Sequence, residues 1–354
     1  MNDVAELKEF AVTHARAQNI AGYRDVLARV DNDEDGAEGS WAIEWTRAGA
    51  ALEERGKHLE AAQCYNMGRF PFVDGPARSD ALRRCVAAFD RWRGPGIERI
   101  AVDGGQVHGW AAGLSAAKPR PLLVVTGGIV SIKEQWAPIL SAVTRLGMAG
   151  VVTEMPGVGE NSLPYTPDSW RMLSAVLDAV AGRADVSRTY ALALSFSGHL
   201  AMRCALDDPR IRGIVTAGAP VRGFFTDRAW LRTVPRLTMD TLAHLTRTGR
   251  DDVAGQLDKW ALSDEQLRAL EIPVYYMKSA RDEIIPPAEA ELVRSRVREA
   301  HLLEHDDTHG SPGHIAETRL WSVWAVLHAR RALPAQRMAL GAALRLLRAR
   351  PRRR

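Results

Sequence analysis

The stretch Thr189-Tyr-Ala-Leu-Ala-Leu-Ser195-Phe-Ser-Gly-His-Leu-Ala-Met-Arg-Cys204 decides the fold of this chain. The five residues before Ser195 are apolar, as in a buried strand, and a helical pattern starts at Ser197. A serine at such a strand-to-helix bend projects its hydroxyl above the edge of a sheet. The bend also directs the backbone N–H of the next residue, Phe196, to the same point. The stretch therefore predicts a nucleophilic serine that stands beside a hydrogen-bond donor.

Two interpretations of Ser195 remain open on this stretch alone. The nucleophile elbow of the α/β-hydrolase fold usually has glycine two positions before and two positions after the serine, because those positions almost touch. Here Ala193 and Ser197 take these places, and they are the next smallest residues. The plainer interpretation is a serine that caps an ordinary helix after a strand. We favour the elbow, and the rest of the chain bears on the choice.

Eight short apolar segments predict strands and alternate with helical patterns. The predicted strands lie at 99–103, 106–114, 121–126, 149–154, 190–194, 213–217, 272–278 and 301–305, and helical patterns lie at 136–146, 169–181 and 288–298. Buried strands that alternate with helices indicate a mostly parallel, doubly wound sheet with helices on both faces. The predicted fold class is therefore α/β, and specifically the α/β-hydrolase fold.

Three segments lie outside this alternation. Residues 1–95 show only helical periodicity and predict an N-terminal helical bundle that serves as a cap. Residues 222–270 are also helical only and interrupt the strands, so we expect a lid insertion over the ligand crevice. The hydrolase core is then 96–221 together with 271–333. We expect the basic C-terminal tail, 334–354, to be a solvated, frayed helix end.

The composition is that of a globular protein, with 46% hydrophobic and 25% charged residues. No apolar run is long enough for a membrane span, and no signal peptide is visible, so we expect no membrane partner. The arginine-rich tail accounts for the net charge of +4, and the remaining near-neutral body argues against nucleic-acid binding. Cys64, Cys85 and Cys204 lack the spacing of metal ligands. We expect buried free thiols and a cytoplasmic location.

A serine hydroxyl needs a neighbouring base, and the base needs an acid that orients it. In this fold the acid follows a late strand. The predicted strand at 272–278 is followed by Ser279-Ala-Arg-Asp282-Glu-Ile-Ile-Pro-Pro287, which places Asp282 at the carboxyl edge of the sheet. Glu283 is the competing acid, and a plain turn residue before Pro286 is the structural alternative. We favour Asp282.

Two histidines compete for the role of the base. The last predicted strand leads into Asp306-Asp-Thr-His309-Gly-Ser-Pro-Gly-His314, so both His309 and His314 are candidates. The base must lie in the loop directly after this strand, whereas His314 opens the final helix, where a histidine is often exposed or caps the helix. We therefore favour His309.

Acyl transfer also needs two donors for the negative charge that develops on the carbonyl oxygen. The N–H of Phe196 is the first candidate. The second should come from the loop Gly127-Gly128-Ile129, because its glycines allow a close backbone approach. We expect the oxyanion hole to consist of Phe196, Ile129 and Gly128, although two glycines alone also fit an ordinary tight turn.

No cofactor and no metal are expected from this sequence. Gly157-Val-Gly159 follows a predicted strand but lacks the third glycine and the acidic partner of a dinucleotide-binding motif. We interpret it as a loop. The expected partner is therefore a small-molecule substrate.

Four motifs resemble the FrsA-like branch of serine α/β-hydrolases, which includes 2,6-dihydroxypseudooxynicotine hydrolase and fungal hydrolases that shorten polyketide pigment precursors. The motifs are Thr126-Gly-Gly-Ile-Val-Ser-Ile-Lys-Glu134, Glu154-Met-Pro-Gly-Val-Gly-Glu160, Ala193-Leu-Ser-Phe-Ser-Gly-His199 and Asp282-Glu-Ile-Ile-Pro286. By this resemblance the catalytic serine, aspartate and histidine are Ser195, Asp282 and His309. The family usually has a Cys-x-Asn stretch after the base, where this chain has Gly310-Ser-Pro-Gly-His314.

The resemblance implies a serine hydrolase that cleaves an ester or a C–C bond next to a ketone through an acyl-enzyme. It also implies a cap and a possible homodimer. A crevice between two helical segments further predicts a bulky, mostly apolar or aromatic substrate. Two alternatives stay open. One is an acyltransferase or cyclase of secondary metabolism, for which an acyl group bound to a carrier protein is a candidate substrate. The other is a non-catalytic binding protein with a hydrolase fold.

Overall fold

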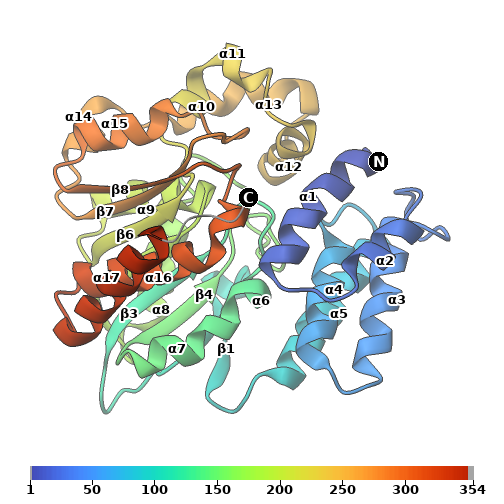
Figure 1. Ribbon diagram of the computed structural model, residues 1–354, viewed down its shortest axis with the longest axis horizontal. Helices are drawn as coiled ribbons and strands as arrows, with labels where there is room; N and C mark the ends of the chain where they lie inside the picture. Colours follow the sequence, from blue (N-terminus) through green and yellow to red (C-terminus); the bar gives the residue numbers. More distant parts are fainter. Residues whose placement is uncertain (1, 350–354) are drawn as a thin grey trace.

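The computed structural model describes residues 2–349 and contains one eight-stranded sheet (Figure 1). The strand order is β1-β2-β4-β3-β5-β6-β7-β8. The strands β1 and β2 form a hairpin, β2 pairs antiparallel with β4, and all later neighbours pair in parallel. Their bounds are β1 (Ile97–Val102), β2 (Val107–Ala112), β3 (Pro121–Thr126), β4 (Ala149–Thr153), β5 (Asp185–Ala193), β6 (Ile211–Ala217), β7 (Val274–Ser279) and β8 (Ala300–His305). The predicted fold class and all eight predicted strands are confirmed.

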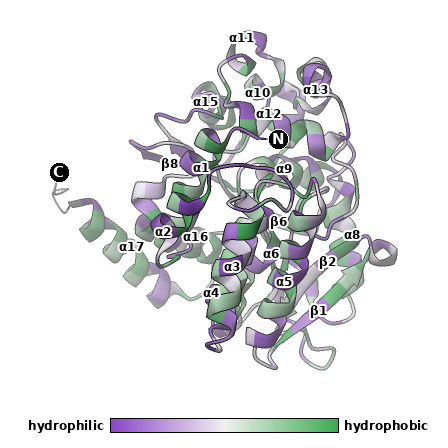
Figure 2. Cartoon of the chain, turned by 90° about the vertical axis from the view of Figure 1, so that its right-hand side faces the viewer, coloured by the Kyte–Doolittle hydropathy of each residue, from purple (hydrophilic) through white to green (hydrophobic). Residues whose placement is uncertain are grey.

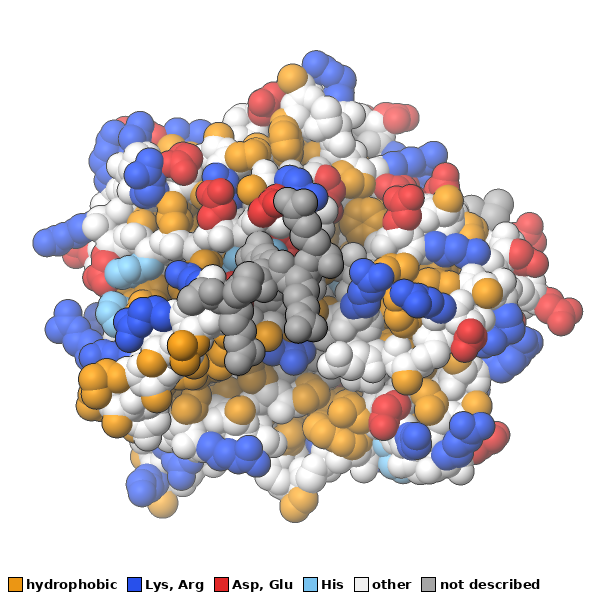
Figure 3. All heavy atoms as spheres, in the orientation of Figure 1, with side chains coloured by type: hydrophobic (Ala, Val, Ile, Leu, Met, Phe, Trp, Pro, Cys, Tyr) orange, Lys and Arg blue, Asp and Glu red, His pale blue; other side chains and the backbone are white. Residues whose placement is uncertain are grey.

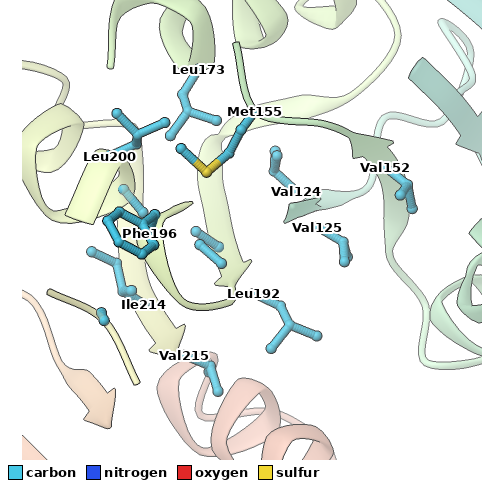
Figure 4. Close-up of a cluster of buried hydrophobic side chains, with 14 of the residues drawn as sticks. Val124, Val125, Val152, Met155, Leu173, Leu192, Phe196, Leu200, Ile214 and Val215 are labelled. Atoms are coloured by element: carbon cyan, nitrogen blue, oxygen red, sulfur yellow. The ribbon is translucent and has the colours of Figure 1, made fainter. Parts of the chain in front are cut away.

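Helices cover both faces of this sheet. In the core they are α6 (Lys133–Trp136), α7 (Leu140–Arg145), α8 (Arg171–Val180), α9 (Phe196–Asp207), α15 (Ala288–Arg296) and α16 (Ile315–Ala329), with short 3-10 turns at Asp103–Gly105, Ala137–Ile139 and Pro312–His314. Side chains alternate along the buried strands. Leu192 and Val215 point to one face, whereas Phe196 and Leu200 lie on the other (Figure 4). The near-continuous apolar strands are therefore buried on both sides, as a parallel sheet requires.

The N-terminal segment forms five helices, and part of it is built into the core. They are α1 (Val4–Ala17), α2 (Tyr23–Arg29), α3 (Trp41–Glu53), α4 (His58–Arg69) and α5 (Pro76–Trp92). Tyr65 of α4 and Phe89 of α5 belong to the same buried cluster as the sheet, and the rings of Phe89 and Trp110 lie 5.1 Å apart. A second cluster joins α1, α2, α3 and α4. Two helices of this segment thus support the sheet directly.

The segment between β6 and β7 is helical, with α10 (Gly223–Thr226), α11 (Arg228–Leu231), α12 (Arg236–Thr246), α13 (Arg250–Gln256), a 3-10 turn (Leu257–Trp260) and α14 (Asp264–Arg268). It meets the N-terminal helices, as Figures 1 and 2 show for α1 and α12. The amide of Leu237 donates to Oε1 of Glu6 at 2.9 Å, and the ring of Phe72 stacks on His244 at 4.4 Å. The two helical segments are therefore in contact above the sheet.

The C-terminal residues up to 349 form the helix α17 (Pro334–Ala349), which packs on α16 at the side of the molecule (Figures 1 and 2). Leu344 is buried, and Nε of Arg348 lies 2.6 Å from Oε1 of Glu317. The described part of the expected tail is thus an ordered helix, while residues 350–354 lie outside the described residues. No described helix has the length and apolarity needed to cross a membrane. Figure 3 shows basic side chains interspersed with acidic and apolar ones on one face.

Candidate active site

Ser195 occupies the sharp bend between β5 and α9. Its φ and ψ angles are 57° and −131°, a backbone conformation that a residue with a side chain rarely adopts. The neighbouring strands hold the bend, because the amide of Ser195 donates to Ala217 O at 2.8 Å and that of Leu194 donates to Thr126 O at 3.0 Å. The hydroxyl of Ser197 bonds to Leu194 O at 2.9 Å, which explains how a serine fits where glycine is usual. The structure thus has the elbow geometry rather than a plain helix cap.

The structure brings Ser195, His309 and Asp282 together at the carboxyl edge of the sheet. Oγ of Ser195 lies 3.0 Å from Nε2 of His309. Nδ1 of the same ring lies 3.0 and 2.9 Å from the two carboxylate oxygens of Asp282. The three side chains follow β5, β7 and β8, which are parallel and deliver their ends to one edge. One ring therefore connects a hydroxyl on one side to a carboxylate on the other.

Backbone groups fix the carboxylate of Asp282 and leave space for the ring of His309. Asp282 is 6% exposed, and its Oδ1 accepts hydrogen bonds from the amides of Ile284 and Ile285 at 3.0 and 2.8 Å. Gly218, at the end of β6, passes directly beside His309. A Cβ at Gly218 would lie 2.7 Å from Cε1 of that ring, and its φ of +58° also favours glycine. The loop after β6 thus leaves room for the histidine.

Glu283 positions the loop of His309, a role that the sequence did not predict. Its Oε2 accepts the backbone N–H of His309 at 3.0 Å, so it holds the histidine loop rather than the ring. Burial by itself lowers the pKa of His309, but the charge of Asp282, its hydrogen bond and the charge of Glu283 together raise that pKa above its ordinary value of 6.5. Two carboxylates therefore favour the protonated ring.

The competing histidine, His314, is bonded elsewhere. Its Nδ1 lies 2.8 Å from Oδ2 of Asp307, and its ring stacks on His305 at 4.3 Å. Asp307 also accepts a hydrogen bond from the amide of Gly313 at 2.7 Å. The Asp307–His314 pair therefore joins the two ends of the loop after β8. His314 therefore belongs to a second carboxylate–histidine pair.

Two amides near Ser195 have no acceptor. A Cβ at Gly128 would lie 3.1 Å from the Cβ of Ser195, so the loop after β3 approaches the serine closely. The N–H of Phe196 is the first of α9 and has no partner one turn earlier. Within residues 2–349, neither this N–H nor that of Ile129 is paired, although both residues are almost fully buried. Buried unpaired donors are uncommon and point to a bound group as their partner.

The loop that carries Ile129 is anchored by two buried cations that sequence reasoning did not assign. Arg69 of α4 is 2% exposed and donates to Val130 O, to Pro71 O and to Asn66. The N-terminal helices therefore hold the loop beside the serine. The only sequence signal is an arginine within an otherwise buried helix turn.

The second anchor is Lys133, at the end of the same loop. It is fully buried, and its Nζ lies 3.1 Å from Glu134, 3.1 Å from Glu154 and 2.7 Å from Glu160. Burial alone lowers the pKa of Lys133, but the three carboxylates raise it above its usual value, so the amine stays charged. All four residues stand in two of the four motifs of the FrsA-like resemblance, 126–134 and 154–160, and the resemblance gave them no role.

Aromatic rings surround the elbow. Phe196 contacts Phe224 edge-to-face at 5.0 Å, and Phe225 lies 6.4 Å from Phe196. Both Phe224 and Phe225 are fully buried in α10, the first helix of the insertion. The insertion therefore packs apolar core side chains against the elbow.

Comparisons with known proteins agree with this architecture. The model of the family described as esterase FrsA-like matches residues 34–308. Esterase FrsA of Vibrio vulnificus (strain YJ016) is 24% identical over 288 residues, which cover 72% of this chain and 68% of that protein.

Two solved structures extend the comparison to nearly the whole chain. AbyA5 wild type is 56% identical, with a TM-score of 0.94, covering 98% of this chain and 100% of that one. The structure of 2,6-dihydroxy-pseudo-oxynicotine hydrolase shares the fold at 19% identity and a TM-score of 0.70, covering 89% of this chain and 95% of that one. The chain belongs to the FrsA-like esterase family and is a serine α/β-hydrolase.

Proposed function

We propose that this protein hydrolyses an ester of a bulky, mostly apolar acyl compound through an acyl-enzyme on Ser195. The observation that carries the proposal is the continuous contact from Oγ of Ser195 through the ring of His309 to Asp282, beside two unpaired amides. A hydroxyl, a base, an orienting carboxylate and an oxyanion site are the parts that acyl transfer needs.

In the first half-reaction the hydroxyl of Ser195 attacks the ester carbonyl carbon while Nε2 of His309 takes its proton. The carbonyl oxygen becomes an oxyanion that accepts hydrogen bonds from the amides of Phe196 and Ile129, and Gly128 allows the close approach. Asp282 accepts the Nδ1–H, keeps the ring in the required tautomer and stabilises its charged form. The C–O bond then breaks, and His309 returns the proton to the leaving alcohol.

In the second half-reaction water replaces the alcohol. His309 takes a proton from water, the hydroxide oxygen attacks the acyl-enzyme, and the same two amides stabilise the second oxyanion. Collapse of this intermediate releases the carboxylic acid and returns the proton to Oγ of Ser195. No group beyond substrate and water is consumed in the cycle.

The class of substrate follows from the surroundings of the serine. The names of the FrsA relatives give esterase activity, which supports an ester as the cleaved group. The name of 2,6-dihydroxy-pseudo-oxynicotine hydrolase supports a small organic substrate. The phenylalanines of α10 and the contact between the two helical segments support an enclosed apolar acyl site.

Fluorophosphonate labelling and ester turnover test this function. Ser195→Ala should keep its melting temperature and lose both labelling and turnover of a p-nitrophenyl ester, by roughly 10⁶-fold in kcat. The matched control is Ser197→Ala, two positions away, whose hydroxyl bonds backbone carbonyls; it should still be labelled. Labelling of the Ser195→Ala protein, or turnover within about tenfold of the unmodified protein, contradicts the proposal.

A further inference from the structure

Arg69 is a buried cation that has no counter-charge beside it. It lies in α4 and is 2% exposed, and burial lowers its pKa to about 10, so it is charged at neutral pH. Its guanidinium donates to neutral oxygens, which are Oδ1 of Asn66 at 3.0 and 2.8 Å, Pro71 O at 3.0 Å and Val130 O. No carboxylate among residues 2–349 forms an ion pair with it. The amine of Lys133 differs, because three carboxylates lie 2.7–3.1 Å from it.

Two peptide groups connect Arg69 to the backbone N–H of Ile129. The first peptide group joins residues 130 and 131. Its carbonyl oxygen accepts the hydrogen bond from Arg69, and its N–H, on Ser131, donates to Gly128 O at 3.0 Å. The second peptide group joins residues 128 and 129, so its carbonyl accepts from Ser131 and its N–H is the unpaired amide of Ile129. Arg69 and this amide are thus the two ends of one series of hydrogen-bonded groups.

The free end of this series lies beside the nucleophile. A Cβ at Gly128 would lie 3.1 Å from Cβ and 3.5 Å from Oγ of Ser195. The peptide between Gly128 and Ile129 is trans, and a trans peptide directs its C=O and its N–H in opposite directions. The N–H of Ile129 therefore points away from Ser131 and is available to a group bound at Ser195.

A cation at one end of such a series strengthens the donor at the other end. Hydrogen bonds in series polarise one another, and electrostatic effects are larger in the low dielectric of a protein interior. A neutral ester carbonyl gains little from a stronger donor, whereas an oxyanion at the same place gains much more. A buried charge without a partner is costly, and the negative charge of the oxyanion, which exists only during the reaction, complements the charge of Arg69.

We propose that Arg69 is a positioning residue that strengthens the oxyanion hole, its positive charge acting through these two peptide groups on the N–H of Ile129. The inference rests on the proposed acyl transfer at Ser195. It gives the N-terminal helices a role beyond covering the site, because α4 then supplies charge to the reaction without touching the substrate. Since the negative charge develops only in the transition state, the effect falls on kcat rather than on KM.

The first test compares three variants of Arg69 in the full chain on a p-nitrophenyl ester. Arg69→Met removes the charge and the donors, Arg69→Gln keeps a neutral donor, and Arg69→Lys keeps a donor and the charge. The kcat of Arg69→Met should fall about 10- to 100-fold, less than the loss of about 10²–10³-fold for removal of an oxyanion donor, because the N–H of Ile129 remains. The KM should change by less than about threefold. Arg69→Lys should recover most of the lost kcat, and Arg69→Gln should recover little.

The second test measures affinity for a mimic of the oxyanion. A trifluoromethyl ketone with the acyl chain of the ester accepts Oγ of Ser195 at its carbonyl carbon, the serine proton passes to His309, and the carbonyl oxygen becomes an oxyanion. Its Ki should rise by the factor by which kcat falls in each variant. The corresponding secondary alcohol binds without this charge, and its Ki should change by less than about threefold. A merely structural role would weaken both inhibitors alike.

Arg78 of α5 provides the matched control. It is also buried and donates to a backbone oxygen, Phe70 O, at 3.0 Å, but it pairs with Asp33 and Asp74. Arg78→Gln should lower the melting temperature without separating the two inhibitors.

Three outcomes overturn the inference. They are a kcat of Arg69→Met within about threefold of the unmodified protein, equal weakening of both inhibitors, or an Arg69→Gln protein as active as Arg69→Lys. Fluorophosphonate labelling of the unmodified protein, and its loss in Ser195→Ala, reports on the proposed function independently of all three.

Discussion

Two histidines that follow β8, His309 and His314, each contact an aspartate, and of these two only His309 also contacts a serine hydroxyl. In the pair of Asp282 and His309, the carboxylate comes from the loop after β7 and the histidine from the loop after β8. In the pair of Asp307 and His314, both residues come from the same loop and lie 2.8 Å apart. The first pair joins two elements, whereas the second closes a single loop.

The contrast shows that a short Asp–His contact is not by itself a catalytic arrangement. The second nitrogen of His309 meets Oγ of Ser195, whereas the ring of His314 stacks on the ring of His305. Both carboxylates are held by backbone amides, so the acids are equally well fixed. The difference is the group on the far side of the imidazole.

The largest expected effect comes from removing the two histidines in turn. His309→Ala should lower kcat on a p-nitrophenyl ester by roughly 10⁶-fold, about as much as loss of the serine, because triad members act as a unit. His314→Ala should keep activity and lower the free energy of unfolding by about 1–2 kcal/mol, because Asp307 loses one partner. Steady-state kinetics and denaturant unfolding measure the two effects. The opposite outcome would make His314 the base.

Substitution of the two aspartates should show the same contrast, with a smaller loss of kcat than substitution of the histidines. Asp282→Asn replaces the acceptor of the Nδ1–H and favours the wrong tautomer, so kcat should fall about 10⁴-fold. Asp307→Asn is the matched control and should change kcat by less than about threefold. Equal losses in the two variants would show that the second pair supports the first.

The smallest expected effect is a shift of the pH profile. His309 must be unprotonated to act as base, and its pKa is raised, so kcat/KM should rise with pH through an apparent pKa above 6.5. Because the folded protein raises the pKa of His309, the fold stabilises the protonated ring. This contribution to the free energy of unfolding is fully present below pH 6.5 and is lost as the pH rises through the raised pKa.

Glu283→Gln removes one of the two charges that raise the pKa of His309 and should move the acid limb of the profile to lower pH. Glu304→Gln, on an exposed position of β8, is the control and should leave the limb in place. If the acid limb of the pH profile is the same in the Glu283→Gln protein, then Glu283 only anchors the loop through the backbone N–H of His309 and does not raise the pKa of the ring.

Much of the site could be predicted because the carboxyl ends of parallel strands meet at one edge. Ser195, Asp282 and His309 each follow a recognisable buried strand. The positions of these residues after their strands therefore predict that the three side chains meet at one edge of the sheet. The substitution of serine for glycine at position 197 weakened the elbow motif, yet its hydroxyl bonds the backbone of the bend. Their catalytic roles stay predictions that the variants above address.

The sequence by itself determined the elements: eight strands, the helices between them, the two helical segments and the loops that carry the site. Those features depend on local periodicity and turn residues, which short stretches encode. Only the tertiary structure decided which helices pack on the sheet, that Arg69 anchors the loop after β3, and that Glu283 accepts the backbone N–H of His309. Such contacts join residues far apart in the chain, and they arise from burial and charge in the folded molecule rather than from any repeat in the sequence.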